Sequence, residues 1–444
     1  MMRDNKFYAF ITNLRWGDVP TSVQERARLW LLDLLGVAAS GTTTRLHEII
    51  SEHAREHFAA GKQSVRTLFG GDRVSPVGAA LVGGMTIDSI DAHDGHKITK
   101  GHVGCGVLPA LLANGDLNPD MDASEFLTQL VIGYEIGTRA GIAMHKTALD
   151  YHTSGSWISL AAATIVSRHL GLCEQKLREA VGIAEFHGAR GLMMRCIDYP
   201  TMVKDGSGWG AMAGTSAAFL ANSGFTGAPT LLIDAPEVAD LWADLGHRWL
   251  TLEQYYKPYP VCRWAQPTVQ AVLNLKEQYG IDASDVKTIE IQTFHNACRL
   301  AVKHPKTTEQ AQYSTAFPAA SALVYGKLGP EQIHENAFAN SEVIRLSESI
   351  TLCENEEFDN HFPARRFADV KLILNDGTEL NSGATEANGD PENPPEPAEM
   401  RRKFFEYAEP VIGRERAANI EQQVLGLTPG RSIKPLLDVI LSAP

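Results

Sequence analysis

The chain has 444 residues, 44% of them hydrophobic, and a formal net charge of −13 at pH 7. Such a length can bury a large core, and at about 100–200 residues per domain it predicts two domains. The negative charge, with no lysine and arginine block to offset it, disfavours nucleic acid and anionic lipid as partners. Residues 1–8 lack a signal-peptide run, and no stretch of roughly 18 apolar residues occurs. We therefore expect a cytoplasmic protein with no membrane partner.

The first part of the chain is predicted to be almost entirely helical. Between residues 22 and 40 the apolar residues recur at helical spacing. Segments rich in Ala, Leu and Gly, with few β-branched clusters, predict further closely packed helices. These segments are 76–90, 123–145, 157–170, 175–187, 209–222 and 266–279.

The pattern changes after about residue 266. Residues 287–294 and 368–374 alternate apolar and polar side chains, which predicts strands, and the turn signal Asn375-Asp376-Gly377 follows the second. Helical stretches at 312–327 and 331–339 lie between them, so this part is predicted to be an α+β unit.

An acidic, proline-rich connection at 388–397 then leads back to a helix at 398–408. We expect the last helices to pack on the first domain, which makes the α+β unit an insertion. The predicted fold is mainly α with an α+β second domain. Its parts are a helical domain over 1–266, an inserted α+β domain over 267–394, and returning C-terminal helices over 395–444.

Ionisable residues are densest in the glycine-punctuated loop 90–109, IDAHDGHKITKGHVGCGVLP. Burying so many ionisable groups without a function would be costly, and a solvated loop is rarely so rich in histidine. The loop is therefore predicted to carry the chemistry. Its candidates are Asp91, His93, Asp94, His96, Lys97, Lys100 and His102.

A metal site is the rival interpretation of this loop. His93 and His96 have H-x-x-H spacing, and Cys105 is nearby, but the helical H-E-x-x-H pattern is absent. The six cysteines form no C-x-x-C pair, which is typical of reduced thiols rather than a disulfide framework, a zinc site or an iron–sulfur cluster. We expect neither a metal nor another cofactor.

Two further motifs contribute candidates. In DYHTSGSW, His152 stands before a helix start whose backbone N–H groups can bind an anion, while Ser154 or Ser156 is expected to cap the helix. In MVKDGSGWGAMAG, Lys204 is predicted to anchor a carboxylate, with an ordinary surface lysine as the alternative. The glycine spacing there is not that of a dinucleotide loop and is more typical of close helix packing.

The segment YKPYPVCR forms a rigid basic turn at the predicted domain boundary, where clefts favour binding sites. It adds Lys257, Tyr259 and Arg263 as candidates for binding substrate. A nucleophilic Cys262 is less favoured than a structural thiol. No G-x-S-x-G elbow occurs, so serine hydrolase chemistry has no support.

These motifs together resemble the MmgE/PrpD family of 2-methylcitrate dehydratases, cis-aconitate decarboxylases and an iminodisuccinate epimerase. The shared features are H-x-x-x-G-V-L-P ending at Pro109, H-T-S-G at 152–155, K-P-Y-P at 257–260, A-Q-Y-S at 311–314, and G-D-P-E-N-P at 389–394 followed by Lys403-Phe404. The resemblance covers most of the chain. It implies a large helical domain built from both chain ends, an inserted α+β lid and a homodimer.

The resemblance also implies site residues. Asp91, His102, His152 and Lys204 take the catalytic positions. The residues expected around a small polyanionic carboxylate substrate are His93, His96, Lys97, Lys257, Tyr259, Arg263, Gln312 and Phe317. This chain departs from the dehydratase pattern, because a threonine is missing near Gly95 and the position of the family's site tyrosine falls on Phe317. Gly206 and Ser207 stand where the dehydratases have a nearby histidine.

The reactions of this family share a carbanion formed beside a carboxylate, which a base generates and cations stabilise. Its fate distinguishes dehydration, decarboxylation and epimerisation. Because missing hydroxyl donors weaken acid assistance to a leaving hydroxide, we expect epimerisation of an iminodisuccinate-type acid. A 2-methylcitrate-type dehydratase is the alternative, a cis-aconitate-type decarboxylase is less favoured, and a binding protein without activity is the least favoured.

Overall fold

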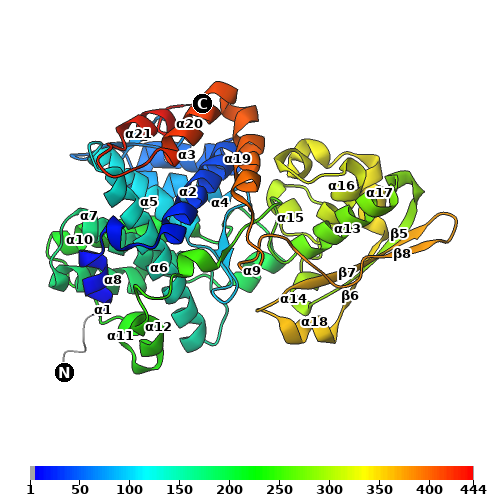
Figure 1. Ribbon diagram of the computed structural model, residues 1–444, viewed down its shortest axis with the longest axis horizontal. Helices are drawn as coiled ribbons and strands as arrows, with labels where there is room; N and C mark the ends of the chain where they lie inside the picture. Colours follow the sequence, from blue (N-terminus) through cyan, green and yellow to red (C-terminus); the bar gives the residue numbers. More distant parts are fainter. Residues whose placement is uncertain (1–5, 444) are drawn as a thin grey trace.

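The computed structural model describes residues 6–443, so the first five residues of the segment considered for a signal peptide lie outside the described range. Two bodies of unequal size lie side by side (Figure 1). The larger is helical, and the smaller combines helices with a sheet. Within residues 6–443 no helix is both long enough and apolar enough to cross a membrane.

The helical body contains six of the predicted helices, with small shifts at their ends. Its longer helices are α1 (Lys6–Asn13), α2 (Thr21–Gly41), α3 (Arg45–His57), α4 (Pro76–Asp88), α5 (Gly104–Leu117), α6 (Ala123–Thr147), α7 (Gly155–His169), α8 (Glu174–His187) and α10 (Ser207–Asn222). Short helices α9 (Met193–Asp198), α11 (Leu231–Asp234) and α12 (Ala239–Ala243) lie between or after them. The six predicted helices are observed as α2, α4, α6, α7, α8 and α10, whereas the prediction over 266–279 corresponds to α13 (Gln266–Tyr279) of the smaller body and α1, α3 and α5 were not predicted.

Small residues let the central helices approach closely. A Cβ placed on Gly84 of α4 would lie only 2.5 Å from Cα of Gly208 on α10, so neither position has room for a larger side chain. The glycine run after Lys204 therefore serves helix packing, as the sequence predicted. Two short antiparallel pairs complete this body: β1 (Val65–Arg66) with β2 (Arg73–Val74), and β3 (Gly95–His96) with β4 (Gln254–Tyr255).

The smaller body holds a five-stranded mixed sheet in the order β6-β5-β7-β8, with β9 also paired to β7. Its strands are β5 (Val286–Thr293), β6 (Ile350–Glu354), β7 (Phe367–Leu374), β8 (Glu379–Asn381) and β9 (Thr385–Glu386). Only β5 and β6 run parallel, with Ile291 opposite Leu352, while Ile291 faces Val370 of antiparallel β7. The two predicted strands are confirmed as β5 and β7.

Helices of this body are α13 (Gln266–Tyr279), α14 (His295–Cys298), α15 (Thr308–Gln312), α16 (Ala316–Tyr325), α17 (Ser341–Ser349) and α18 (Glu356–His361). The single helix predicted over 312–327 is wrong, because residues 313–315 break it. Ser314 Oγ donates to the carbonyl of Val302 at 2.5 Å and accepts from the N–H of Phe317, competing with the helical pattern. The helix predicted over 331–339 is also wrong, since this stretch forms two 3₁₀ turns after Gly329-Pro330.

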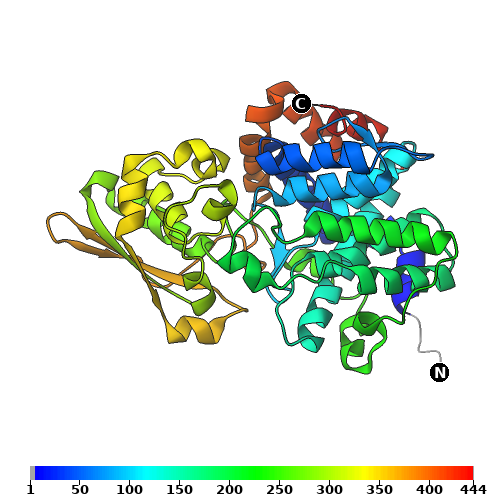
Figure 2. The ribbon, with the colours of Figure 1, turned by 180° about the vertical axis from the view of Figure 1, so that it is seen from behind.

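The C-terminal helices return to the helical body, as the orange and red ribbon beside the blue helices shows in Figures 1 and 2. They are α19 (Pro397–Ile412), α20 (Arg414–Leu425) and α21 (Lys434–Ile440), and α19 packs along α2. From α19 the buried Lys403 pairs with Asp33 of α2 at 2.9 Å and donates to the carbonyl of Ala92 at 2.7 Å. The last part of the chain thereby holds the histidine-rich loop in place.

Candidate active site

The histidine-rich loop leaves α4 at Asp88, pairs with β4 through β3, and re-enters a helix at Gly104. Asp91, His93, Asp94 and His102 on it are all buried. Buried charges require partners, because desolvation without compensation would neutralise them. The contacts of the loop show which partners they have.

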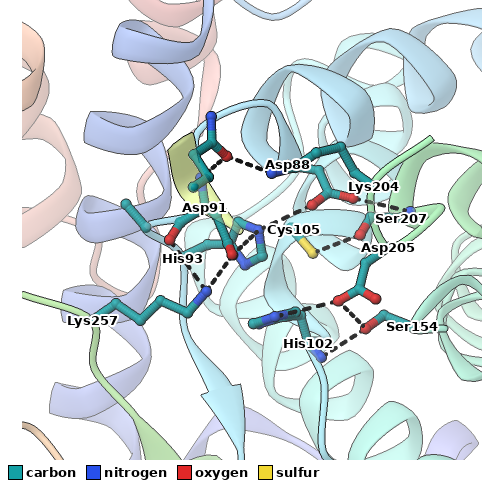
Figure 3. A network of polar contacts seen from close by, with 12 residues as sticks. Asp88, Asp91, His93, His102, Cys105, Ser154, Lys204, Asp205, Ser207 and Lys257 are labelled. Atoms are coloured by element: carbon teal, nitrogen blue, oxygen red, sulfur yellow. Dashed lines mark hydrogen bonds and ion pairs between the residues drawn. The ribbon is translucent and has the colours of Figure 1, made fainter. Parts of the chain in front are cut away.

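Asp91 is surrounded by groups from three distant segments (Figure 3). Its carboxylate forms an ion pair with Lys257 Nζ, which also donates to the Asp91 carbonyl at 3.2 Å. Gln312 Oε1 accepts from the backbone N–H of Asp91 at 3.1 Å and from Lys204 Nζ. Burial alone would raise the pKa of Asp91, but the ammonium groups of Lys257 and Lys204 outweigh it and hold that pKa below the usual range. Asp91 is therefore a buried carboxylate with cations beside it.

His102 forms an acid/base pair with Asp205. Its Nδ1 lies 2.6 Å from the carbonyl oxygen of Asp94, so Nδ1 carries the proton and donates it, because a carbonyl only accepts. Nε2 then faces Asp205 Oδ2 at 3.4 Å. Burial and the nearby ammonium of Lys257 lower the pKa of His102 well below its usual value. The imidazole is thus neutral and presents the lone pair of Nε2.

Asp205 has the opposite electrostatic environment to Asp91. Burial, together with the neighbouring carboxylates of Asp88 and Asp91, raises the pKa of Asp205 to about 7. Ser154 orients the pair, since its Oγ accepts from the N–H of His102 at 2.9 Å and donates to Asp205 Oδ2 at 3.1 Å. A carboxyl group whose pKa lies near neutral pH, beside a neutral imidazole, is suited to passing a proton in either direction.

Of the two serines expected to cap this helix, Ser154 is the N-cap residue of α7, but its hydroxyl does not cap the helix. The Ser154 side chain makes no capping hydrogen bond at the start of α7 because it is engaged with His102 and Asp205. Ser156 Oγ donates instead to the carbonyl of Ala189 at 3.2 Å.

One group of side chains in the described part of the chain has metal-ligand geometry. The candidate ligand atoms of Asp91, His93 and His102 all lie within 4.8 Å of one another. His93 Nε2 stands 3.4 Å from Asp88 Oδ1 and 4.0 Å from Asp91 Oδ1. A divalent cation bound here would have to displace or repel the ammonium of Lys257 on Asp91.

The rival metal motif from the sequence is not assembled. His96 is directed away from His93, with Nε2 at 3.7 Å from Glu253 Oε2 and Nδ1 accepting from Thr99. Cys105 Sγ donates to Ser207 Oγ at 3.2 Å, and burial raises the pKa of its thiol.

A cavity of about 20 Å³ lies at this cluster, between the helical body and the inserted α+β domain. That volume holds about one water molecule. Its lining residues are Asp91, Lys100, His102, Tyr151, Met193, Asp205, Tyr255, Cys262, Arg263, Trp264, Tyr313 and Arg366. Tyr313 and Arg366 come from the inserted domain, so both bodies build the site.

The structure brings together eight of the predicted residues at or beside the cavity. They are Asp91, His93, Lys100, His102, Lys204, Lys257, Arg263 and Gln312. Lys204 is buried rather than on the surface, which removes the alternative considered for it. Its Nζ also lies 4.7 Å from the centre of the Tyr313 ring.

Other predicted residues have their contacts elsewhere. Within residues 6–443 His152 makes no hydrogen bond or ion pair to the cluster; its backbone N–H faces His145 Nε2 at 3.4 Å, and its Nδ1 is buried without a partner. Lys97 pairs with Glu392 at 2.7 Å and with Asp390 at 3.2 Å. Tyr259 donates to Gln270 at 2.8 Å.

The missing hydroxyl donors have a structural explanation. Phe317 packs edge-on against Phe338, with ring centres 5.4 Å apart, whereas Tyr313 lines the cavity. A Cβ on Gly95 would lie 2.4 Å from the Tyr255 hydroxyl and 2.8 Å from His102 Nδ1, so only glycine fits there. The hydroxyl-bearing side chains of Tyr313 and Tyr255 therefore line the site although the sequence lacks the expected threonine and tyrosine.

Sequence reasoning did not select Asp205, Tyr313 or Arg366. Asp205 follows Lys204 directly, and Tyr313 lies in the A-Q-Y-S motif, so both carried a local signal. Arg366 stands in an ordinary basic pair before β7, and only the fold directs it to the cavity.

Fold and site together define a two-domain, mainly helical enzyme with a buried acid/base cluster at the domain boundary. Residues 5–241 match the MmgE/PrpD N-terminal domain, and residues 259–427 match the MmgE/PrpD C-terminal domain. The chain belongs to the MmgE/PrpD family.

Several characterised proteins are similar to the chain over nearly its whole length. The cis-aconitate decarboxylase-like protein oryM of Aspergillus oryzae is 26% identical over 97% of this chain and 95% of its own length. A cis-aconitate decarboxylase of Aspergillus terreus is 26% identical over 97% and 94%, and that of Homo sapiens is 24% identical over 95% and 91%.

Proposed function

We propose that this protein is a lyase that acts on a small unsaturated polycarboxylate of the cis-aconitate type, removing one carboxyl group as CO₂. The observation that carries the proposal is the pairing of the His102–Asp205 proton carrier with the cations around Asp91 in one desolvated site. The similarity to cis-aconitate decarboxylases along nearly the entire chain supports the same reaction.

The proposed chemistry uses the chain's own residues. The bond between the leaving carboxyl group and its carbon breaks, and the electron pair stays on the substrate. The ammonium groups of Lys204 and Lys257 stabilise the negative charge that spreads onto a neighbouring carboxylate, which is a strong effect in a dry site. The His102–Asp205 pair supplies the proton that the carbon then takes up. We propose Asp91 as the group that orients Lys257.

His152, the fourth residue that the family resemblance places at a catalytic position, remains a proposal without a contact to the cluster. The homodimer and the cytoplasmic location likewise remain proposals that rest on the family resemblance and the sequence.

Epimerisation of an iminodisuccinate-type acid is the second candidate. The sequence favours it because the expected threonine and tyrosine are absent, but Tyr313 and Tyr255 provide hydroxyl-bearing side chains at the cavity. That reason for preferring epimerisation over a lyase reaction is lost. What remains in its favour is that a proton carrier beside cations also suits exchange at a carbon next to a carboxylate.

The test is proton NMR in D₂O with cis-aconitate, 2-methylcitrate and iminodisuccinate offered separately to the purified protein. The proposal expects CO₂ release from cis-aconitate and one deuterium in the five-carbon diacid product. Alkene formation from 2-methylcitrate without decarboxylation would assign a dehydratase instead. Deuterium exchange with inversion of iminodisuccinate, and no reaction of the other two acids, would assign the epimerase.

A further inference from the structure

Arg366 is a buried arginine of the inserted domain with few hydrogen bonds to its guanidinium. It is 5% exposed, and neither Nε nor Nη1, both buried, has a hydrogen-bond partner within residues 6–443. Nη2 makes only a long contact of 3.4 Å to the carbonyl of Lys97. The guanidinium lies over the Tyr255 ring, 5.5 Å from its centre, and lines the cavity. Unpaired buried donors are costly, so such an arrangement is typical of a site built for a ligand.

Lys100 lines the same cavity from the helical body. Its Nζ lies 4.6 Å from the centre of the Tyr151 ring, and within residues 6–443 it has no carboxylate partner. The backbone at Lys100 has φ of 52°, a conformation that non-glycine residues rarely adopt, and the Tyr151 hydroxyl donates to its carbonyl. Burial and the charge of Arg366 both lower the pKa of Lys100, as expected for two cations facing one space.

The other cations of the site already have partners. Arg263 is paired with Asp390 at 2.6 Å, Lys257 with Asp91, and Lys204 with Gln312. Gln312 is neutral and does not cancel the charge of Lys204. Within residues 6–443, Lys100 and Arg366 line the cavity without an ion pair of their own, and Asp390, whose pKa Arg366 helps to lower, is paired with Arg263. An anion between Lys100 and Arg366 would satisfy the free guanidinium N–H groups and relieve the repulsion between the two cations.

We propose that Lys100 and Arg366 form a subsite for a substrate carboxylate that does not react. The planar guanidinium suits a two-point hydrogen bond to a carboxylate, and the ammonium adds a point charge. Identifying this ligand as substrate rests on the proposed function. Because the two residues belong to different domains, one carboxylate bound by both holds the inserted domain against the helical body. The cavity of about 20 Å³ is too small for a tricarboxylate, so the groups that line it must rearrange when one binds.

Calorimetric binding of tricarballylate, which has three carboxylates but no double bond or hydroxyl group, tests the subsite without turnover. Arg366→Gln and Lys100→Gln are each expected to weaken tricarballylate binding roughly 10- to 100-fold, the range for a hydrogen bond to a charged group. The double variant should lose less affinity than the product of the two single losses.

Arg365→Gln is the matched control, since it removes the same charge from the neighbouring position. Arg365 is exposed and pairs with Glu386 at 2.5 Å, so this variant should bind tricarballylate like the wild type. If the Arg365 and Arg366 variants lose affinity for tricarballylate equally, the loss comes from long-range electrostatics rather than from contact with Arg366, and the subsite proposal is overturned. Wild-type affinity in both the Arg366 and Lys100 variants, or no binding of tricarballylate by the wild type, would also overturn it.

Without ligand, the Arg366→Gln and Lys100→Gln variants should have a melting temperature no lower than that of the wild type, because each substitution removes one of two cations that repel each other. If Arg366→Gln does not fold, Arg366→Lys and Lys100→Gln carry the test, and unchanged affinity in both overturns the proposal. The experiments distinguish failure of the decarboxylase assignment from failure of the subsite. If the variants lose affinity for tricarballylate but the wild type releases no CO₂ from cis-aconitate, only the decarboxylase assignment is rejected. If the wild type releases CO₂ but both variants bind tricarballylate like the wild type, only the subsite is rejected.

Discussion

Lys204 of the helical body donates a hydrogen bond to Gln312 of the inserted domain, and the same Gln312 oxygen accepts from the N–H of Asp91 at 3.1 Å. The Gln312 amide nitrogen in turn donates to the carbonyl of Ser89 at 2.9 Å. One side chain thus links both domains to the loop that carries Asp91. The position of Lys204 depends on how the two domains meet.

Lys204→Met should lower kcat/KM strongly while leaving the fold intact. Losing one buried charge partner of a carboxylate costs on the order of 2–5 kcal/mol, because nothing replaces the ammonium in a dry site. Steady-state kinetics with cis-aconitate and thermal melting would measure the two effects. The exposed Lys327→Met is the control variant. Unchanged kinetics in Lys204→Met would remove Lys204 from the site.

His102→Ala should reduce kcat by roughly 10²-fold or more, the range for a positioned acid or base. The family resemblance predicts a similar loss for His152→Ala. The structure distinguishes the two, since His102 contacts Asp205 whereas His152 makes no hydrogen bond or ion pair to the cluster within residues 6–443. Single-turnover rates of both variants would decide, and near-wild-type turnover in either one excludes that histidine from the chemistry.

The pH dependence should be governed by Asp205, whose folded pKa of about 7 lies above its ordinary value of 3.8. A raised pKa contributes stability that is fully present below the unfolded pKa of 3.8 and is lost progressively until the pH has risen through about 7. Activity should fall as the pH rises through about 7, because the pair loses the proton it donates. Asp205→Asn should remove the loss of stability between about pH 4 and about pH 7, measured by urea unfolding over that range, and a wild-type profile in that variant would contradict the assignment.

Exhaustive chelation should leave activity unchanged. The Asp91–His93–His102 group has ligand-like spacing, but Lys257 already neutralises the carboxylate of Asp91. Metal analysis of the purified protein, with kinetics before and after dialysis against a chelator, measures this directly. Stoichiometric metal whose removal abolishes activity and whose return restores it would make that group a metal centre.

Lys403→Met should destabilise the fold by about 3–5 kcal/mol, because it leaves the buried Asp33 without its cation. It also removes the 2.7 Å hydrogen bond to the carbonyl of Ala92. The double variant Asp33→Asn/Lys403→Met should recover part of the stability, since no lone charge remains. Urea unfolding of both variants tests this, and equal stability of the single variant and the wild type would show that the pair contributes little.

The sequence by itself determined most of the long elements and the chemistry of the loop. A period-3.6 pattern located α2 and strict alternation located β5 and β7, because each reports which face is buried. Composition rich in Ala, Leu and Gly located most of the other long helices, whereas α3 and α5 were not predicted. Asp91, His93 and His102 were identifiable because so many ionisable residues in one short loop have no structural use. The helix predicted over 331–339 failed because a short apolar run does not distinguish an α-helix from 3₁₀ turns.

Only the tertiary structure decided which charges are compensated. His93, His96 and Lys97 are close in sequence, yet His96 turns to Glu253, Lys97 to Glu392, and His93 alone stays at the cluster. Conversely, Asp205 and Arg366 reach the cavity from segments 161 residues apart in the chain (366 − 205). The raised pKa of Asp205 and the unpaired guanidinium nitrogens of Arg366 both depend on burial and on the distances to neighbouring charges. These distances are set only when the two domains pack together.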